Sequence, residues 1–236
     1  MSRKLPARDV ELLRIVGRFR MLSRAQVKRW LFVGLSDPIV SRCIDRLSSR
    51  GYLGVERLHG NGIQVMWLRR EGKEFLIDHH TPAADLFAAN GPAAAKDFEH
   101  TLAIGDVAAW LATKIMPPDE FLPAWAVQRV FSGVSKSIPD LVAIWRDEAS
   151  AQSAAVMLVE VDLGTEPIKS VLGPKLQNLC TLAAELFRGA VVAIVAFVPS
   201  ERRRDSLQKL ASEIQVNLEV RLLGDCGGAA GAKSKC

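Results

Sequence analysis

The chain has 236 residues, of which 49% are apolar and 24% charged, a composition typical of a folded protein with one or two cores. Its first residues are polar and basic, unlike a secretory signal, and no apolar run approaches the length that spans a bilayer. We therefore expect a cytoplasmic protein without membrane contact. Four scattered cysteines argue against a disulfide framework and against a zinc site.

The net charge of +5 is distributed unevenly along the chain. Residues 1–80 contain sixteen Lys and Arg against eight Asp and Glu, whereas the rest contains fifteen against eighteen. A basic segment suggests a polyanionic partner, because cations that neutralise phosphates release condensed counterions. Solvated surfaces are often basic as well, so the charge matters only if the fold supplies a DNA-binding scaffold.

The elements predicted for residues 1–80 supply such a scaffold. Apolar spacing and cap residues predict a helix over 8–19, helices after Ser23 and from Asp37 to the terminator Gly51, strands over 52–58 and 63–68, and a helix over 71–77. Ser23 and Gln26 have the spacing of a capping box, and Pro38 suits the first turn of a helix. Helices followed by a hairpin in this order are typical of a winged helix-turn-helix domain that binds double-stranded DNA.

The third predicted helix carries a basic ridge opposite its apolar stripe. Arginines recur there every four residues, and a forked guanidinium suits guanine edges and phosphates in the major groove. The candidate DNA-binding residues, on this helix, on the helix before it and at the hairpin tip, are Lys28, Arg29, Ser41, Arg42, Arg46, Arg50, His59 and Asn61. A solvated basic face and a protein-interaction module remain the alternatives.

A second domain is predicted after a linker. Residues 81–95 are rich in Ala, Pro, Asn and Gly and are expected to be the linker, and residues 224–236 a disordered tail. Residues 96–223 should form a mixed central sheet with helices on both sides, in the order α-β-β-β-α-β-α-β. The predicted elements are a helix over 96–114, strands over 125–131, 138–145 and 154–161, a helix over 167–187, a strand over 190–198, a helix over 200–214 and a strand over 218–222.

Three acidic residues stand at the ends of the predicted strands, Asp140, Glu160 and Asp162. Strand alternation puts Glu160 and Asp162 on one side, and the neighbouring strand brings Asp140 beside them. Their carboxylates are candidates for a catalytic oxygen cage around Mg²⁺ or Mn²⁺, with Lys175 orienting a water or stabilising the phosphorus. Acids at strand ends also cap helices or pair with lysines, which is the structural alternative.

This pattern resembles the PD-(D/E)XK nuclease superfamily, which has a Pro-Asp, a strand hairpin and an acid pair in an α-β-β-β-α-β core. The likeness covers residues 96–198 and implies a nuclease-like domain in an α/β (α+β) protein. The superfamily usually places lysine two residues after its second acid, where this chain has Asp162. We interpret Lys175 as the migrated replacement.

The whole chain also resembles the replication-relaxation family of plasmid and integrative-element proteins. The residues concerned are Pro139-Asp140, the run from Glu160 to Glu166, and Lys175-Leu176, behind a winged helix. The resemblance implies an accessory factor of replication, relaxation or mobilisation, with relaxase or replication proteins as partners and a metal-dependent nicking activity that is weak or absent. The alternative is a non-catalytic transcriptional regulator whose second domain serves dimerisation or docking. We expect a homodimer, because mobile-element operators are commonly palindromic.

Overall fold

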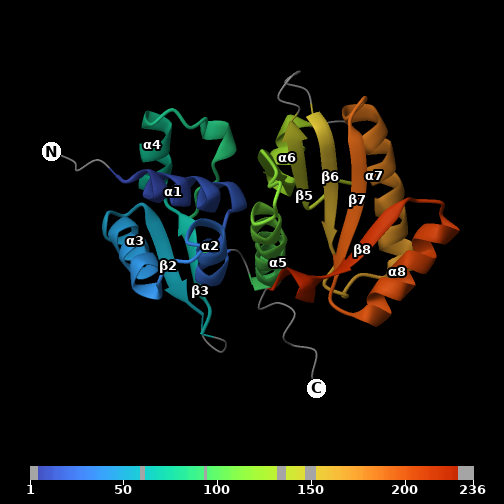
Figure 1. The fold of residues 1–236 in the computed structure, drawn as a ribbon, viewed down its shortest axis with the longest axis horizontal. Coiled ribbons are helices and arrows are strands. Elements are labelled where there is room, and N and C mark those ends of the chain that lie inside the picture. Colours follow the sequence, from blue (N-terminus) through green and yellow to red (C-terminus); the bar gives the residue numbers. More distant parts are fainter. Residues whose placement is uncertain (1–4, 59–61, 93–94, 132–136, 147–152, 228–236) are drawn as a thin grey trace. The chain divides into compact units, whose positions relative to one another are not determined.

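The computed structural model describes residues 5–58, 62–92, 95–131, 137–146 and 153–227, which are drawn in colour in Figure 1. The chain divides into two compact units, Met1–Gly105 and Asp106–Cys236, and each contains its own sheet. This mixture of helices and sheets confirms the α/β class expected from the sequence. None of the helices in the described ranges combines the length and the hydropathy that a membrane span requires.

The first unit packs helices against a small antiparallel sheet. Its elements are α1 (Ala7–Phe19), β1 (Leu22–Ser23), α2 (Arg24–Leu31), α3 (Asp37–Ser49), β2 (Leu53–Arg57), β3 (Gln64–Leu68), α4 (Arg70–Asp78) and η1 (Ala83–Asp85). The strands lie in the order β1-β3-β2, so β3 is central and β2 pairs with it as a hairpin. The core is formed by the apolar faces of α1, α3 and β3, which are fully buried.

Local sequence signals set the helix ends in this unit. The Ser23 hydroxyl accepts a hydrogen bond from the Gln26 N–H at 3.2 Å, and the Gln26 side chain accepts one from the Ser23 N–H at 2.8 Å, which completes the predicted capping box. Helix α3 has Pro38 in its first turn, where the missing N–H is not needed. Gly51 follows α3 with φ of 74°, in the left-handed region that favours glycine.

Residues 81–92, predicted as a linker, pack on the first unit. The Phe87 N–H donates to the Gly17 carbonyl at 2.8 Å, and Leu86 is buried, 3% exposed, close to Gly17. The boundary between the two units falls instead at Gly105, within α5 (Ala95–Ala112). The linker was predicted from composition alone. Small and turn-forming residues are common in linkers, but they are equally common in irregular segments that pack against a domain through backbone hydrogen bonds.

The second unit is built on a mixed sheet. Its elements after α5 are β4 (Glu120–Pro123), α6 (Ala124–Val130), β5 (Leu141–Arg146), β6 (Ser153–Val161), η2 (Ile168–Leu172), α7 (Gly173–Leu186), β7 (Val191–Val198), α8 (Glu201–Glu213), β8 (Leu218–Leu222) and η3 (Leu223–Cys226). The strands lie in the order β4-β5-β6-β7-β8. The pairs β4·β5 and β5·β6 are antiparallel, whereas β6·β7 and β7·β8 are parallel, as a mixed sheet requires.

Two predicted elements of this unit are corrected. The segment 125–131, predicted as a strand, falls in helix α6 and its C-cap Phe131, and the first strand is β4. In so short a segment the alternation of apolar residues does not separate a strand from a helix, and packing of Val127 on the core and of Phe131 on Phe187 favours the helix. The helix predicted over 167–187 begins with a π-helical turn, η2, and α7 follows it with Pro174 in its first turn, where the missing N–H is not needed.

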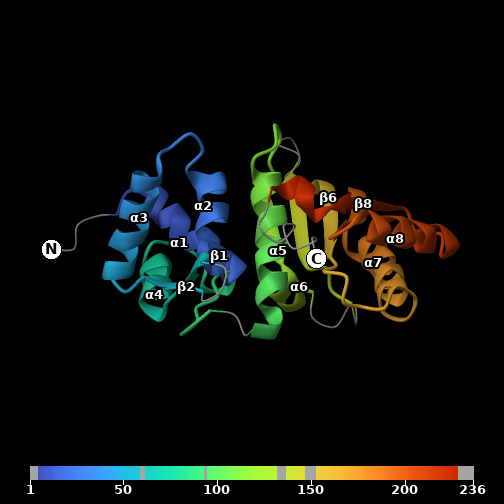
Figure 2. The same ribbon diagram turned by 90° about the horizontal axis from the view of Figure 1, so that it is seen from below.

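The sheet of the second unit lies between two helical layers. Figure 2 shows α7 and α8 on one side of the sheet and α5 on the other. On the α7–α8 side, Val156 and Leu158 of β6 pack with Leu176 and Leu207. On the other side, Trp110 of α5 meets Phe197 edge to face at a centroid distance of 6.0 Å. Even-numbered residues of β6 therefore face α7 and α8, and this direction determines what Glu160 contacts.

Candidate functional site

Two of the predicted acids lie opposite each other where β5 begins and β6 ends. The register pairs Leu141 with Val159, which places Asp140 across from Glu160. The Asp140 N–H donates to the Val159 carbonyl at 2.9 Å, and its Oδ2 accepts the Val161 N–H at 2.8 Å. Asp140 is 6% and Glu160 2% exposed, so both carboxylates are held in the protein interior.

Helix α7 brings a cation to this pair of acids. The Lys175 ammonium forms a hydrogen-bonded ion pair with Oε1 of Glu160, and its Nζ lies 3.9 Å from Oδ1 of Asp140. Burial by itself lowers the pKa of Lys175, but the charges of Asp140 and Glu160 raise it, and the net pKa is above its ordinary value. Lys175 therefore stays protonated near neutral pH and lies beside both acids.

Asp162 lies on the same side of the sheet but has a different partner. Its Oδ2 accepts a hydrogen bond from Nε of Arg203, on α8, at 2.5 Å, and its Oδ1 accepts the Gly164 N–H at 2.8 Å. Among the residues that the structure describes, no group of three or more His, Cys, Asp or Glu side chains is placed to hold a metal ion. The carboxylates expected to converge are thus divided: Asp140 and Glu160 share Lys175, whereas Asp162 is turned to Arg203.

The candidate DNA-binding residues around α2 and α3 take part in a bridge between these helices. Lys28 Nζ lies 2.9 Å from Oδ1 of Asp37, and Arg24 donates to the Asp37 carbonyl at 2.9 Å and to the Ser41 hydroxyl at 3.0 Å. The Lys28 ammonium, followed by Arg24, holds the pKa of Asp37 below its ordinary value. Lys28 and Ser41 therefore stabilise the turn between α2 and α3 in the protein alone.

The predicted arginine ridge of α3 is not uniform. Arg46 turns toward α1, where its Nε and Nη2 lie 2.6 and 2.8 Å from the carboxylate of the buried Asp9. Arg42 is exposed, and Arg50 is half-buried at the helix end. The prediction of an outward ridge is therefore wrong for Arg46, its middle residue. Without Arg46, the carboxylate of Asp9 would be buried and unpaired, which is costly inside the core.

Three further candidates complete the predicted DNA-binding set. Arg29 is half-buried on α2. His59 and Asn61, predicted to let the hairpin tip touch DNA, lie outside the described residues. The strands that lead to this tip are β2 and β3, and Arg57 is exposed at the last position of β2.

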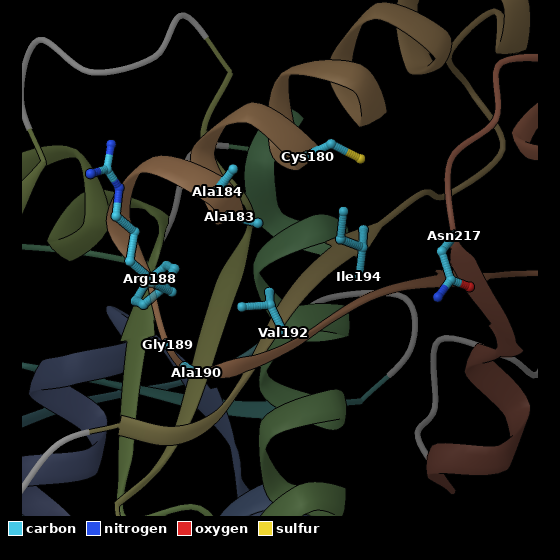
Figure 3. Close-up of a pocket in the computed structure, with 10 residues that line it drawn as sticks. Cys180, Ala183, Ala184, Arg188, Gly189, Ala190, Val192, Ile194 and Asn217 are labelled. Carbon is cyan, nitrogen blue, oxygen red and sulfur yellow. The ribbon is translucent and has the colours of Figure 1, made fainter.

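The second unit also has an open pocket of about 390 Å³, at the other end of the sheet. Figure 3 shows Cys180 and Ala183 of α7 on one side of this pocket, Val192 and Ile194 of β7 on another, and Asn217 at its edge. The lining is mainly apolar and includes none of the predicted site residues. It is therefore separate from the acids that lie where β6 ends.

Two charged residues that matter here were not predicted from the sequence. Asp9 and Arg203 each sit in a charged stretch that looks like an ordinary solvated helix start. Their partners, Arg46 and Asp162, are 37 and 41 residues away along the chain. The available signal was weak: an acid among the apolar residues of α1, and an arginine three residues after the cap Ser200 of α8.

Comparison with known proteins gives one family. A family model described as replication-relaxation matches residues 13–184, which include α2, α3, both strands of the acid pair and Lys175. A search of curated protein sequences gives no match.

Proposed function

Because the chain belongs to the replication-relaxation family, we propose that it acts in replication or relaxation of plasmid or mobile-element DNA. In this proposal the first unit is a winged helix-turn-helix that binds double-stranded DNA. The second unit is a nuclease-like domain whose site, made of Asp140, Glu160 and Lys175, acts on a DNA phosphate. The observation that carries the proposal is that Lys175, on helix α7, lies within 3.9 Å of both acids at the ends of β5 and β6.

The arrangement of α2 and α3 supports DNA binding. The helices are joined by a short turn that Arg24 and Lys28 tie to Asp37, so α3 is presented on a fixed support. Arg42 is exposed on α3, and Arg57 is exposed on the strand that leads to the predicted wing. An arginine on the presented helix can contact a base edge, and one on the wing can contact a phosphate.

The chemistry of the acid pair suits a hard divalent cation. Asp140 and Glu160, from adjacent strands, already share one cation, the Lys175 ammonium. Mg²⁺ in phosphate-processing sites is typically held by one or two carboxylates together with water and substrate phosphates. We therefore assign Asp140 and Glu160 as the residues that would hold Mg²⁺ or Mn²⁺. Such an ion, when bound, would lower the pKa of a water and offset charge on a scissile phosphate.

The residues of the chain have separate roles in this proposal. The backbone N–H of Val161 fixes one oxygen of Asp140, so this carboxylate is aligned before any ligand binds. Lys175 is protonated and about a quarter exposed, which lets its ammonium turn from Glu160 toward a bound phosphate. Preorganised charges of this kind stabilise the negative charge that develops on phosphorus.

The deciding experiment is a nicking assay on supercoiled plasmid with Mg²⁺ or Mn²⁺. Wild-type protein should nick the plasmid, and Glu160→Gln, which keeps the shape of the side chain, should not. Glu213→Gln is the matched control, because Glu213 is exposed on α8. The Asp140→Ala/Glu160→Ala double variant should also be inactive while it still binds DNA.

The non-catalytic alternative also has one observation in its favour. The Lys175 ammonium pairs with Glu160 and lies 3.9 Å from Asp140, as in a salt bridge retained for structure. Intact DNA binding by a wild-type protein that does not nick with either metal would remove the catalytic part of the proposal. The protein would then be a DNA-binding regulator whose second unit serves dimerisation or docking.

A further inference from the structure

The ion pair of Asp162 and Arg203 is used in none of the roles above. The side chain of Asp162 is 1% exposed and that of Arg203 15%. Nε of Arg203 donates to Asp162, and Nη2 of the same guanidinium donates to the backbone carbonyl of Glu166. One arginine of α8 therefore holds both ends of the turn from Asp162 to Glu166.

The middle of this turn is held as well. Gly164 donates its N–H to Oδ1 of Asp162 and has φ of 84°. A Cβ at Gly164 would lie 3.3 Å from Cγ of Pro199, just before α8, so the turn is close to this segment. At the start of α8, the Ser200 hydroxyl accepts the Arg203 N–H at 3.3 Å, which fixes the helix turn that carries the guanidinium.

The held turn is adjacent to the acid pair. Asp162 follows Glu160 by two residues, directly after the end of β6. Lys175 of α7 lies at the same end of this strand, where it pairs with Glu160. The turn therefore continues directly from the strand that carries Glu160, the residue that pairs with Lys175.

We propose that Asp162 and Arg203 are a positioning pair, which holds the turn from Asp162 to Glu166 and so fixes the end of β6, where Glu160 holds the Lys175 ammonium. The importance of this pair for DNA chemistry rests on the proposed function. The contacts that define the pair are independent of that function. It gives Asp162 a role different from that of a metal ligand. Neither side chain of the pair touches DNA or a metal in this role.

The first test needs no metal. Full-length Arg203→Met is compared with Arg202→Met, a matched control because Arg202 is exposed on the same helix. Acetylation of Lys175 and hydrogen exchange over residues 162–166 are followed by mass spectrometry well below the unfolding temperature, with the exposed Lys209 as internal reference. Both rates should rise about threefold or more in Arg203→Met alone, because the turn opens locally. Equal rates in the two variants would overturn the proposal.

The second test measures Mn²⁺ binding by calorimetry. Arg203→Met should weaken binding by about tenfold, the usual size of an effect transmitted through a supporting residue, and Arg203→Lys should restore part of it. If Asp162 were a metal ligand that competes with Arg203, Arg203→Met would bind Mn²⁺ as tightly as wild type or more tightly, and the positioning role would be wrong. If the wild-type chain binds no Mn²⁺, the proposed function loses its metal, whereas the labelling rates still decide the positioning role.

Discussion

Arg46 on α3 donates two hydrogen bonds to the carboxylate of Asp9 on α1, at 2.6 and 2.8 Å. Asp9 is 2% exposed and also accepts a hydrogen bond from the Cys43 thiol at 3.2 Å. The pair with Asp9 raises the pKa of Arg46, and burial followed by the bond to Asp9 raises the pKa of Cys43 to about 12. This contact joins two helices of the first unit, which makes Arg46 a stabilising residue there.

We expect Arg46→Ala to lower the free energy of unfolding by about 1–3 kcal/mol, because it leaves the buried Asp9 carboxylate without its cation. The expected loss of stability is smaller than for a fully buried ion pair, because the Arg46 side chain is 39% exposed and solvent screens its charge. Urea unfolding measures the change, with Arg42→Ala as the control, expected within about 0.5 kcal/mol of wild type. Equal stability of the two variants would contradict the assignment.

DNA affinity should depend on Arg42, the exposed arginine of α3. Arg42→Ala should weaken binding of a specific duplex by about 1–3 kcal/mol if it contacts a base, and it should lower the salt dependence if it contacts phosphate. Fluorescence anisotropy over a range of salt concentrations separates the two effects. Arg188→Ala, which removes an exposed arginine of the second unit, is the control. An equal loss in both variants would place DNA elsewhere.

The pH dependence of stability should report on Lys175. Its pKa is raised in the folded protein above the ordinary 10.5, so its contribution is complete below that pH and is lost as the pH rises through the folded value. The difference in unfolding free energy between wild type and Lys175→Met should therefore be constant near neutral pH and narrow in alkali. The exposed Lys169 provides the control, Lys169→Met. A difference that grows in alkali would show that Lys175 is not held by the acids.

Gly164 should resist substitution. Gly164→Ala places a Cβ in the left-handed region and 3.3 Å from Pro199, and we expect a loss of about 1–2 kcal/mol. Gly224→Ala is the control, because a Cβ there meets no atom within 4 Å. Thermal unfolding compares the two, and similar midpoints would mean that the turn relaxes around the new side chain.

Local signals predicted much of the fold. Ser23 with Gln26, and Gly51 after α3, mark helix ends through contacts only a few residues apart in sequence, and the structure has them as expected. The strand β8 is found at its predicted residues, Leu218–Leu222. Where the pattern was short, as over 125–131, alternation of apolar residues did not separate a helix from a strand, and the prediction was wrong.

The candidate site was predictable in its residue types and less so in its pairing. Strand alternation correctly put Glu160 and Asp162 on one side of the sheet, because both take partners from the α7–α8 layer. Alternation does not say which cation each acid meets. That depends on where α7 and α8 cross the strand ends, and it separates Asp162 from Asp140 and Glu160.

The packing of residues 81–92 determines where a separately folding fragment of the first unit can end. Cutting after residue 80 would remove Phe87, which donates to Gly17, and Leu86, whose loss would expose apolar surface of α1. The same cut would remove Leu102, whose carbonyl accepts a hydrogen bond from Gln26 at 2.7 Å. A fragment that ends at Gly105 keeps all of these contacts, so the shortest stable piece of the first unit is expected to be longer than its helix-and-hairpin motif.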